Sequence, residues 1–365
     1  MTVYILYYCF ITVMYWILFN SKCSLVWGTD CNKCMQDKKK IFIIVAGFVW
    51  TCIVGLRVPS LGNDINGYYY YYDFCARDSY KTILTTYYMG KYANFEIGYV
   101  LLCKTVDVFF HSKQALLFFA ALAATVPVQI FLYRYSKNPW LSWVIYLGLP
   151  FSGVCYFSGI RQNIALSIVL LATGFAKEKK IIPFSLLILL ATTFHKTAPI
   201  GFFIYLLMNL RIKKKEAVGL GTLSLIILWI FNKQIFTFIG KFTYRAEIQD
   251  THATRFFILL VGIYYLSRLF FENKEVSGYL NLLWVATAIE AFAGLNYTIG
   301  RLGWFFLAPL GELITEITLT ENIKEKQIMR YSKYIFAIIF IGLGLYYLRY
   351  DSVAQSYPYV FLFDL

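Results

Sequence analysis

The chain has 365 residues, of which 59% are hydrophobic and 20% aromatic, and its formal net charge is +14. Soluble globular proteins average about 45–50% apolar residues, so this composition excludes an ordinary soluble domain. Lysine and arginine stand mostly in short segments between apolar runs, as the positive-inside bias of membrane proteins requires. We therefore expect membrane lipid as a partner and no nucleic acid.

Twelve apolar segments without period-2 alternation predict transmembrane helices, because only helices and closed barrels satisfy backbone groups in lipid. They are residues 3–19, 41–56, 115–133, 140–156, 162–176, 181–195, 197–210, 217–231, 256–271, 279–296, 301–317 and 331–348. The first lacks a basic leader and a small-residue cleavage site, which favours a retained span. We expect an all-α polytopic membrane protein whose residues 1–365 form a single integral membrane domain.

Basic clusters set the expected orientation, since they belong in cytoplasmic loops. These clusters are Lys38 to Lys40, Arg134 with Lys137, Lys177 with Lys179 and Lys180, Arg211 with Lys213 to Lys215, Lys274, and the group at 324–330. Placing all of them inside requires that residues 57–113 form one long external loop. Residues 96–110, which contain Lys104 and Asp107, then predict an amphipathic helix at the outer interface and not a span. Both termini fall outside.

The external loop carries the first polar candidates. Arg57 presents a planar fork of donors suited to phosphate oxygens. Asp64 ends a Gly-Asn-Asp turn before five consecutive tyrosines, Tyr68 to Tyr72, and its carboxylate suits a general base for a hydroxyl. Two plainer interpretations stay open, in which Arg57 anchors a helix end at the lipid headgroups and Asp64 caps a turn.

Three further polar features fall on the same predicted side. Arg161 and Gln162 begin a span directly after a segment rich in glycine, and a cation near the apolar layer is costly unless it has a function. His195 stands between two short spans and suits phosphate binding or proton relay. Arg301 begins a late span. Each has a structural alternative, namely a snorkelling arginine, a satisfied histidine or an interfacial anchor.

Metal and nucleotide chemistry find no support in the sequence. The three histidines have no zinc spacing, and the Cys31–Cys34 pair has no second pair of ligands nearby. Walker, GxGxxG, HExxH and GxSxG contexts do not occur. We therefore predict no metal and no cofactor.

The ordered set of these motifs resembles the EpsG family, the Wzy-like polymerases of bacterial exopolysaccharide, capsule or O-antigen. The resemblance runs from about residue 41 to 317 and rests on Arg57, Gly62-Asn63-Asp64, Tyr68, Glu96-Ile97-Gly98-Tyr99, Ile160-Arg161-Gln162-Asn163, Phe194-His195-Lys196-Thr197 and Arg301. Asn163 and Lys196 depart from the small residues that are usual there.

The resemblance implies a GT-C-like glycosyltransferase of the bacterial cytoplasmic membrane with an outward-facing active site. Its donor and acceptor would be oligosaccharide repeat units on undecaprenyl diphosphate, and a flippase and a chain-length regulator would be further partners. The implied roles are Asp64, Glu96 and His195 in catalysis, and Arg57, Tyr68, Arg161, Gln162 and Arg301 in binding the diphosphate and sugar. A lipid-linked oligosaccharide ligase and a non-enzymatic flippase or transporter remain alternatives.

Overall fold

The computed structural model describes residues 1–20, 31–92, 95–240, 254–271, 273–319 and 326–364. All regular secondary structure within these ranges is helical. The only β pairing there is an isolated antiparallel bridge between Arg57 and Phe361. The predicted all-helical fold is therefore confirmed.

Each of the twelve predicted segments overlaps a helix or two consecutive helices. The long helices are α1 (Thr2–Asn20), α2 (Cys31–Gly55), α6 (Lys113–Tyr135), α9 (Ile160–Lys177), α12 (Lys214–Ile230), α14 (Thr254–Phe270), α15 (Lys274–Ala293) and α18 (Lys326–Tyr350). The shorter ones are α7 (Pro139–Gly148), α8 (Pro150–Phe157), α10 (Ile181–Thr192), η2 (Ala198–Gly201), α11 (Phe202–Asn209), α13 (Asn232–Gly240), α16 (Tyr297–Leu307), α17 (Leu310–Thr318) and the terminal turn η3 (Leu362–Asp364).

Fewer than twelve helices are both long enough and apolar enough to cross a membrane by themselves. In the described part of the chain, these helices are α1, α6, α15 and the segment Tyr331–Tyr350 of α18. The pairs α7–α8 and α12–α13 are long and apolar enough jointly but bend by 74° at their junctions, which gives four to six spans. Helix α10 has 12 residues and is about 18 Å long at 1.5 Å per residue, well short of a bilayer core. The number twelve stays a prediction.

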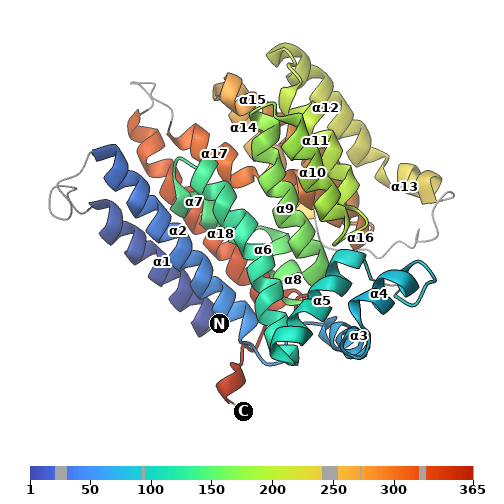
Figure 1. The fold of residues 1–365 in the computed structure, drawn as a ribbon. Coiled ribbons are helices and arrows are strands. Elements are labelled where there is room, and N and C mark those ends of the chain that lie inside the picture. The colour runs from blue at the N-terminus through green and yellow to red at the C-terminus, as the bar shows by residue number, and fades with distance from the viewer. Residues whose placement is uncertain (21–30, 93–94, 241–253, 272, 320–325, 365) are drawn as a thin grey trace.

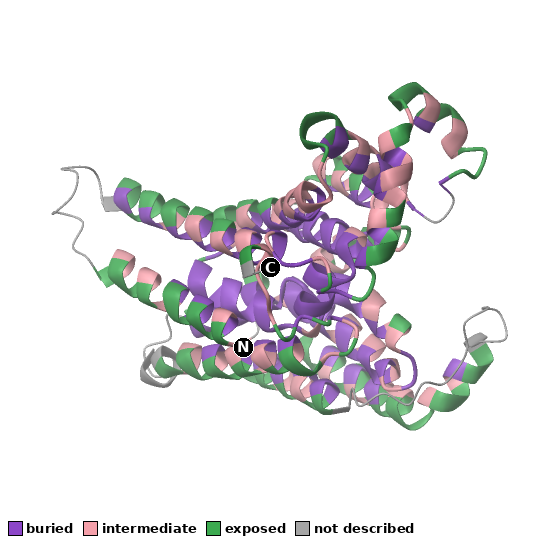
Figure 2. Cartoon of the chain, turned by 90° about the horizontal axis from the view of Figure 1, so that it is seen from below, coloured by how far each residue is buried: buried purple, intermediate pink, exposed green. Residues whose placement is uncertain are grey.

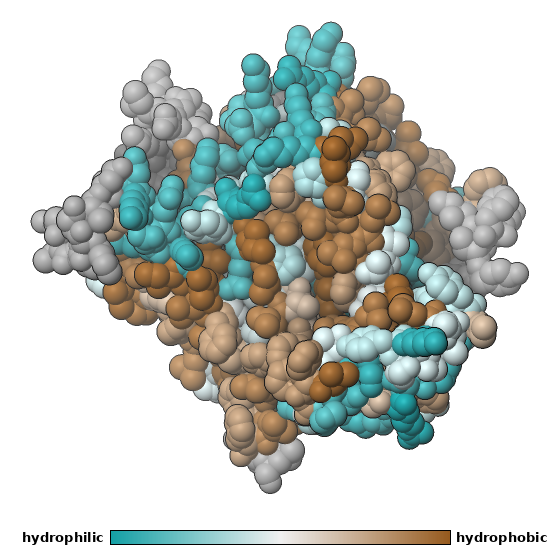
Figure 3. Space-filling view, viewed as in Figure 1, coloured by the Kyte–Doolittle hydropathy of each residue, from teal (hydrophilic) through white to brown (hydrophobic). Residues whose placement is uncertain are grey.

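The buried centre of the bundle is α9, which packs against α6, α8, α10, α11 and α16. Most of its residues are buried, whereas the outward faces of peripheral helices such as α1 and α12 are exposed (Figure 2). Many of those exposed side chains are apolar, including Leu6, Trp16, Leu220 and Ile338. On the face shown in Figure 3, hydrophobic residues form a broad zone between hydrophilic residues above and below it, which is the surface that lipid contact requires.

The segment between residues 57 and 113 folds into α3 (Ile65–Arg77), α4 (Tyr80–Tyr87) and α5 (Ile97–Phe110). These helices lie at the same end of the bundle as both chain termini (Figure 1), and we call it the site end. The sequence indicated only the last of them. Helix α3 was not predicted, because a run of tyrosines shows no alternation between apolar and polar residues. In the structure Tyr68 and Tyr72, four residues apart, are buried and Tyr70 is exposed, as expected for one buried helix face.

The basic clusters whose side chains the structure describes gather at the opposite end, whereas the side chains of the group at 324–330 lie outside the described residues. Lys39 Nζ donates to the carbonyl of Ser136, and Arg134 Nη2 lies 3.8 Å from a carboxylate oxygen of Glu178. Lys177 Nζ lies 3.2 Å from Glu275. The basic segments therefore share one end and α3–α5 occupy the other. Which end faces the cytoplasm stays a prediction.

Candidate functional site

An ion pair between Glu96 and Arg161 forms the centre of the candidate site. Glu96 precedes α5 and Arg161 lies in the first turn of α9, where its Nη1 donates to Glu96 Oε2. The two side chains are only 15% and 25% exposed. The guanidinium also lies 4.1 Å from the centroid of the Phe95 ring. A charge pair in such a poorly solvated place interacts more strongly than one at a wet surface.

His195 joins this pair from a third segment, the connection between α10 and η2. Its Nδ1 lies 3.7 Å from Glu96 Oε1, and the same oxygen accepts the backbone N–H of Lys196 at 3.0 Å. Burial lowers the pKa of His195 to about 4, although the neighbouring Glu96 carboxylate acts in the opposite direction. The imidazole is therefore neutral at pH 7 and able both to donate and to accept a hydrogen bond.

Gly98 explains why these segments meet. Its backbone N–H donates to the carbonyl of Thr193 at 2.7 Å, which joins the start of α5 to the end of α10. A Cβ at position 98 would lie 2.5 Å from Thr193 Oγ1, so a side chain there would push the two segments apart. The glycine of the Glu-Ile-Gly-Tyr motif thus allows Glu96 to reach His195.

Arg301 approaches from α16. Its carbonyl accepts Gln162 Nε2 at 3.3 Å, so the second arginine stands beside the residue that follows Arg161. The Arg301 guanidinium lies 5.6 Å from the ring centroids of both Tyr297 and Trp304. Its side chain makes no hydrogen bond or ion pair with any residue in the described ranges, and Nε is buried. Arg301 is thus a half-buried cation with no carboxylate of the described residues within ion-pair distance, although Asp351 lies within its electrostatic reach.

Tyr68 and Asp64 border the site from α3. The Tyr68 side chain is buried, with its ring centroid 5.8 Å from the Arg161 guanidinium and 5.2 Å from the Tyr99 ring. Asp64 stands one helical turn earlier at the N-cap of α3, exposed and without a side-chain capping hydrogen bond. The capping alternative raised by the sequence is therefore not what the Asp64 carboxylate does here.

Arg57 behaves differently from the other two arginines. It is 1% exposed and all three guanidinium nitrogens donate to backbone carbonyls, Nε to Leu61 at 3.1 Å, Nη2 to Phe157 at 2.8 Å and Nη1 to Val54. Because these donors are already used, the geometry favours a structural role over the phosphate binding expected from the sequence.

The turn before α3 packs against the end of α8. Gly62 has a φ of 109°, and a Cβ there would lie 2.0 Å from the carbonyl oxygen of Phe157, so only glycine fits. The Asn63 N–H donates to Ser158 Oγ at 2.8 Å, and that hydroxyl donates to the carbonyl of Val353. Ser158 thus links the end of α8, the turn and the C-terminal segment, a role that no sequence signal indicated.

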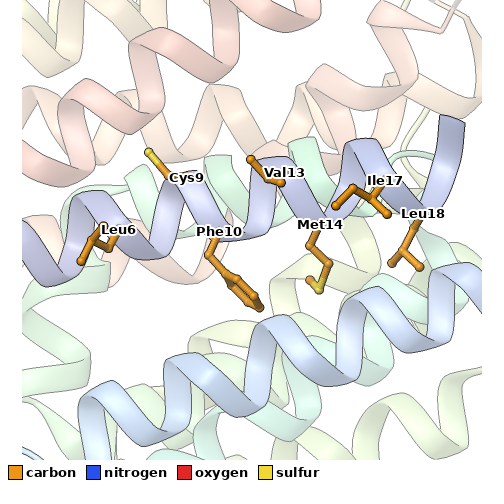
Figure 4. A pocket seen from close by; sticks show the side chains of 7 residues that line it. All are labelled: Leu6, Cys9, Phe10, Val13, Met14, Ile17 and Leu18. Carbon is orange, nitrogen blue, oxygen red and sulfur yellow. The ribbon is translucent and has the colours of Figure 1, made fainter.

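A groove of about 530 Å³ runs along α1 (Figure 4) and its lining is apolar, consisting of Leu6, Cys9, Phe10, Val13, Met14, Ile17 and Leu18. Among the residues that the structure describes, no three His, Cys, Asp or Glu side chains gather as metal ligands would.

Apolar spans and a polar cluster at one end define a multi-pass helical membrane protein with an ionic site. A family model described as "EpsG family" matches residues 40–361, which is most of the chain. The chain therefore belongs to the EpsG family, a family of Wzy-like polysaccharide polymerases, as the motif order predicted. Neither the comparison with curated proteins nor that with solved structures finds a match.

Proposed function

We propose that the protein is a membrane glycosyltransferase that joins undecaprenyl-diphosphate-linked oligosaccharide repeat units at the external face of the bacterial cytoplasmic membrane. The observation that carries this proposal is the meeting of Arg161 and Arg301 with Glu96 and His195 at one end of the bundle. Four segments far apart in the sequence supply these groups. The GT-C-like arrangement and the twelve spans belong to the same proposal.

The reaction needs a stabilised leaving group and a base. The acceptor hydroxyl oxygen attacks the anomeric carbon of the donor sugar, and the bond from that carbon to the diphosphate oxygen breaks. Undecaprenyl diphosphate leaves with the electron pair, so its oxygens gain negative charge. Arg301 has donors and makes no ion pair within the described part of the chain, which suits it to bind those oxygens.

The acceptor proton goes to a carboxylate. Asp64 is the better candidate because it is exposed and caps nothing. Glu96 ranks second, since one of its oxygens accepts from Arg161 and the other from the Lys196 N–H. In this arrangement Glu96 orients Arg161 toward the diphosphate, and the neutral His195 donates to a phosphate oxygen or relays a proton.

Tyr68 and Gln162 complete the site by fixing the two arginines. The Tyr68 ring lies against Arg161, and the Gln162 amide ties the first turn of α9 to α16. Clustering of these groups at one end favours an enzyme over a transporter, whose polar groups are expected near mid-depth in both halves of the chain.

The proposal is tested with purified protein in lipid nanodiscs and lipid-linked repeat units extracted from the cells in which the chain is native. The parent should produce ladders of lengthening polymer. Asp64→Asn, Arg161→Ala and Arg301→Ala should abolish the ladders at equal amounts of folded protein. The control Lys137→Ala, at the opposite end, should retain them.

Three outcomes would contradict parts of this proposal. Ladders that survive all three substitutions would overturn the residue roles. Transfer of a single unit to a different acceptor without ladders would replace the polymerase by a ligase. Translocation of the lipid-linked sugar without any glycosyl transfer would overturn the enzyme.

A further inference from the structure

Two unpartnered polar atoms lie at the start of α16. The Tyr297 hydroxyl and Arg301 Nε are both buried, and neither makes a hydrogen bond to the described part of the chain. They belong to residues one helical turn apart, and the Arg301 guanidinium lies 5.6 Å from the Tyr297 ring centroid. Buried polar atoms without partners are uncommon, and two on one turn need an explanation.

Glu290 brings a carboxylate to the same place from α15. Its side chain belongs to a residue that is 9% exposed, and within the described ranges it makes no hydrogen bond and no ion pair. Its Oε2 lies 4.0 Å from the position of a Cβ on Gly300, so the carboxylate is directed at the first turn of α16. The Tyr297 hydroxyl is within electrostatic reach of both Glu290 and Arg301.

A neighbouring carboxylate shows the contrast. Asp351 also lies within electrostatic reach of the Tyr297 hydroxyl. However, its Oδ1 accepts the backbone N–H groups of Val353 at 2.8 Å and Ala354 at 3.0 Å. Asp351 therefore closes the turn after α18, whereas the oxygens of Glu290 have no such structural use. Leaving a buried polar group unsatisfied is costly, so the Tyr297 hydroxyl and Arg301 Nε, one helical turn apart, call for a ligand that satisfies both.

The chemistry of the three groups selects a class of ligand. Arg301 only donates, a tyrosine hydroxyl donates and accepts, and a carboxylate accepts when ionised. An ionised Glu290 would repel a diphosphate, whereas in either protonation state it hydrogen-bonds a hydroxyl. Sugar hydroxyls both donate and accept, so a sugar ring satisfies the whole set.

We propose that Glu290 and Tyr297, beside Arg301, form a subsite for the hydroxyls of the sugar directly attached to the diphosphate. This inference rests on the proposed function, because it takes Arg301 to bind the diphosphate of that lipid. The sugar next to a diphosphate held by Arg301 reaches groups one turn away. Glu290 and Tyr297 thus determine which first sugar the protein accepts.

The test compares the binding of two lipids to protein in nanodiscs. One is undecaprenyl diphosphate, and the other is the lipid-linked repeat unit extracted from the cells in which the chain is native. Tyr297→Phe and Glu290→Gln remove one polar function each at nearly constant size. Each should weaken binding of the repeat unit roughly 5- to 20-fold and leave binding of the bare lipid diphosphate within about twofold. Arg301→Ala should weaken both.

Glu312→Gln is the matched control, because Glu312 is a buried carboxylate in α17 toward the opposite end. It should leave both dissociation constants unchanged. Equal dissociation constants for the two lipids in the parent, or no selective loss in Tyr297→Phe and Glu290→Gln at unchanged melting temperature, would overturn the subsite. Polymer ladders are scored separately, so an active parent with failed selectivity contradicts the subsite alone, and selective binding without ladders contradicts the polymerase alone.

Discussion

Glu316, at the end of the bundle opposite α3–α5, accepts Lys137 Nζ at 2.8 Å and Lys177 Nζ at 3.5 Å, and Lys177 also lies 3.2 Å from Glu275. At the site end, Arg301 has no carboxylate within ion-pair distance in the described part of the chain, and its buried Nε has no hydrogen-bond partner there. The described lysines and carboxylates of the opposite end are therefore mostly paired with each other, although Glu312 there also has a buried Oε1 without a hydrogen-bond partner. Arg301 differs in being a half-buried cation with no carboxylate of the described residues within ion-pair distance.

Under the proposed function, this difference separates structural charges from charges that bind the lipid diphosphate. Lys177 and Glu316 neutralise each other and hold α9 against α17, which is a use in folding. An unpaired cation in a poorly solvated place raises the free energy of the protein unless something else neutralises it. The Arg161–Glu96 pair lies between these extremes, because it is paired and yet adjoins His195 and Arg301.

The largest effect is expected from Arg301, the unpaired charge. Arg301→Ala should reduce the initial rate of polymer formation roughly 10²- to 10³-fold, because it removes donors aimed at charge that develops on the leaving diphosphate. Arg301→Lys should recover only part of the rate, since a point charge replaces a planar fork. Unchanged rates in Arg301→Ala would remove the distinction between the two ends.

Glu96→Gln should have the next largest effect. The amide keeps the shape of the side chain and leaves Arg161 without its counter-charge, so we expect about a tenfold loss of rate together with a lower melting temperature. In the double variant Glu96→Gln with Arg161→Gln, the increase in activation free energy should be smaller than the sum of the increases in the two single variants, because the two side chains act as a pair. Strict additivity in this cycle would show that the ion pair has no role.

Glu316→Gln probes the opposite end. It should lower the free energy of unfolding by about 1–3 kcal/mol, since two lysines lose a buried charged acceptor. The rate per folded molecule should stay unchanged, and thermal unfolding with a rate assay on the same samples checks both. A large loss of rate at normal stability would place function at this end as well.

Ser158→Ala should have the smallest effect. The Asn63 N–H loses its acceptor, which corresponds to about 1 kcal/mol, and the turn that carries Asp64 becomes less well held. We expect a rate reduced about two- to fivefold, with normal binding of undecaprenyl diphosphate. A loss confined to lipid binding would contradict this positioning role.

Much of the candidate site could be predicted from the sequence, because the site residues are polar or charged and stand next to long apolar segments. Arg161, His195 and Arg301 were each recognisable as costly groups near the membrane, and a common predicted side was enough to expect them together. Glu290 carries the same signal, an acidic residue inside the apolar segment 279–296, and would have been found by applying the same rule to that span.

Other features depend on partners that no local pattern reveals. Arg57 looks like a phosphate ligand until the carbonyl of Phe157, 100 positions away, is seen to accept its Nη2. Ser158 and Phe95 gain their roles only through the packing of α8 and α9 against the segment between residues 57 and 113. The short length of α10 was likewise hidden, since its apolar run continues to the turn that carries His195.

The most direct test of the central claim compares Arg301→Ala with Lys137→Ala in the nanodisc polymerisation assay, at matched amounts of folded protein. Both substitutions remove one cation, Arg301 from the second turn of α16 and Lys137 from the connection between α6 and α7. The account predicts that polymer ladders disappear in Arg301→Ala and persist in Lys137→Ala. Equal loss in both variants, or ladders of normal length in Arg301→Ala, would contradict it.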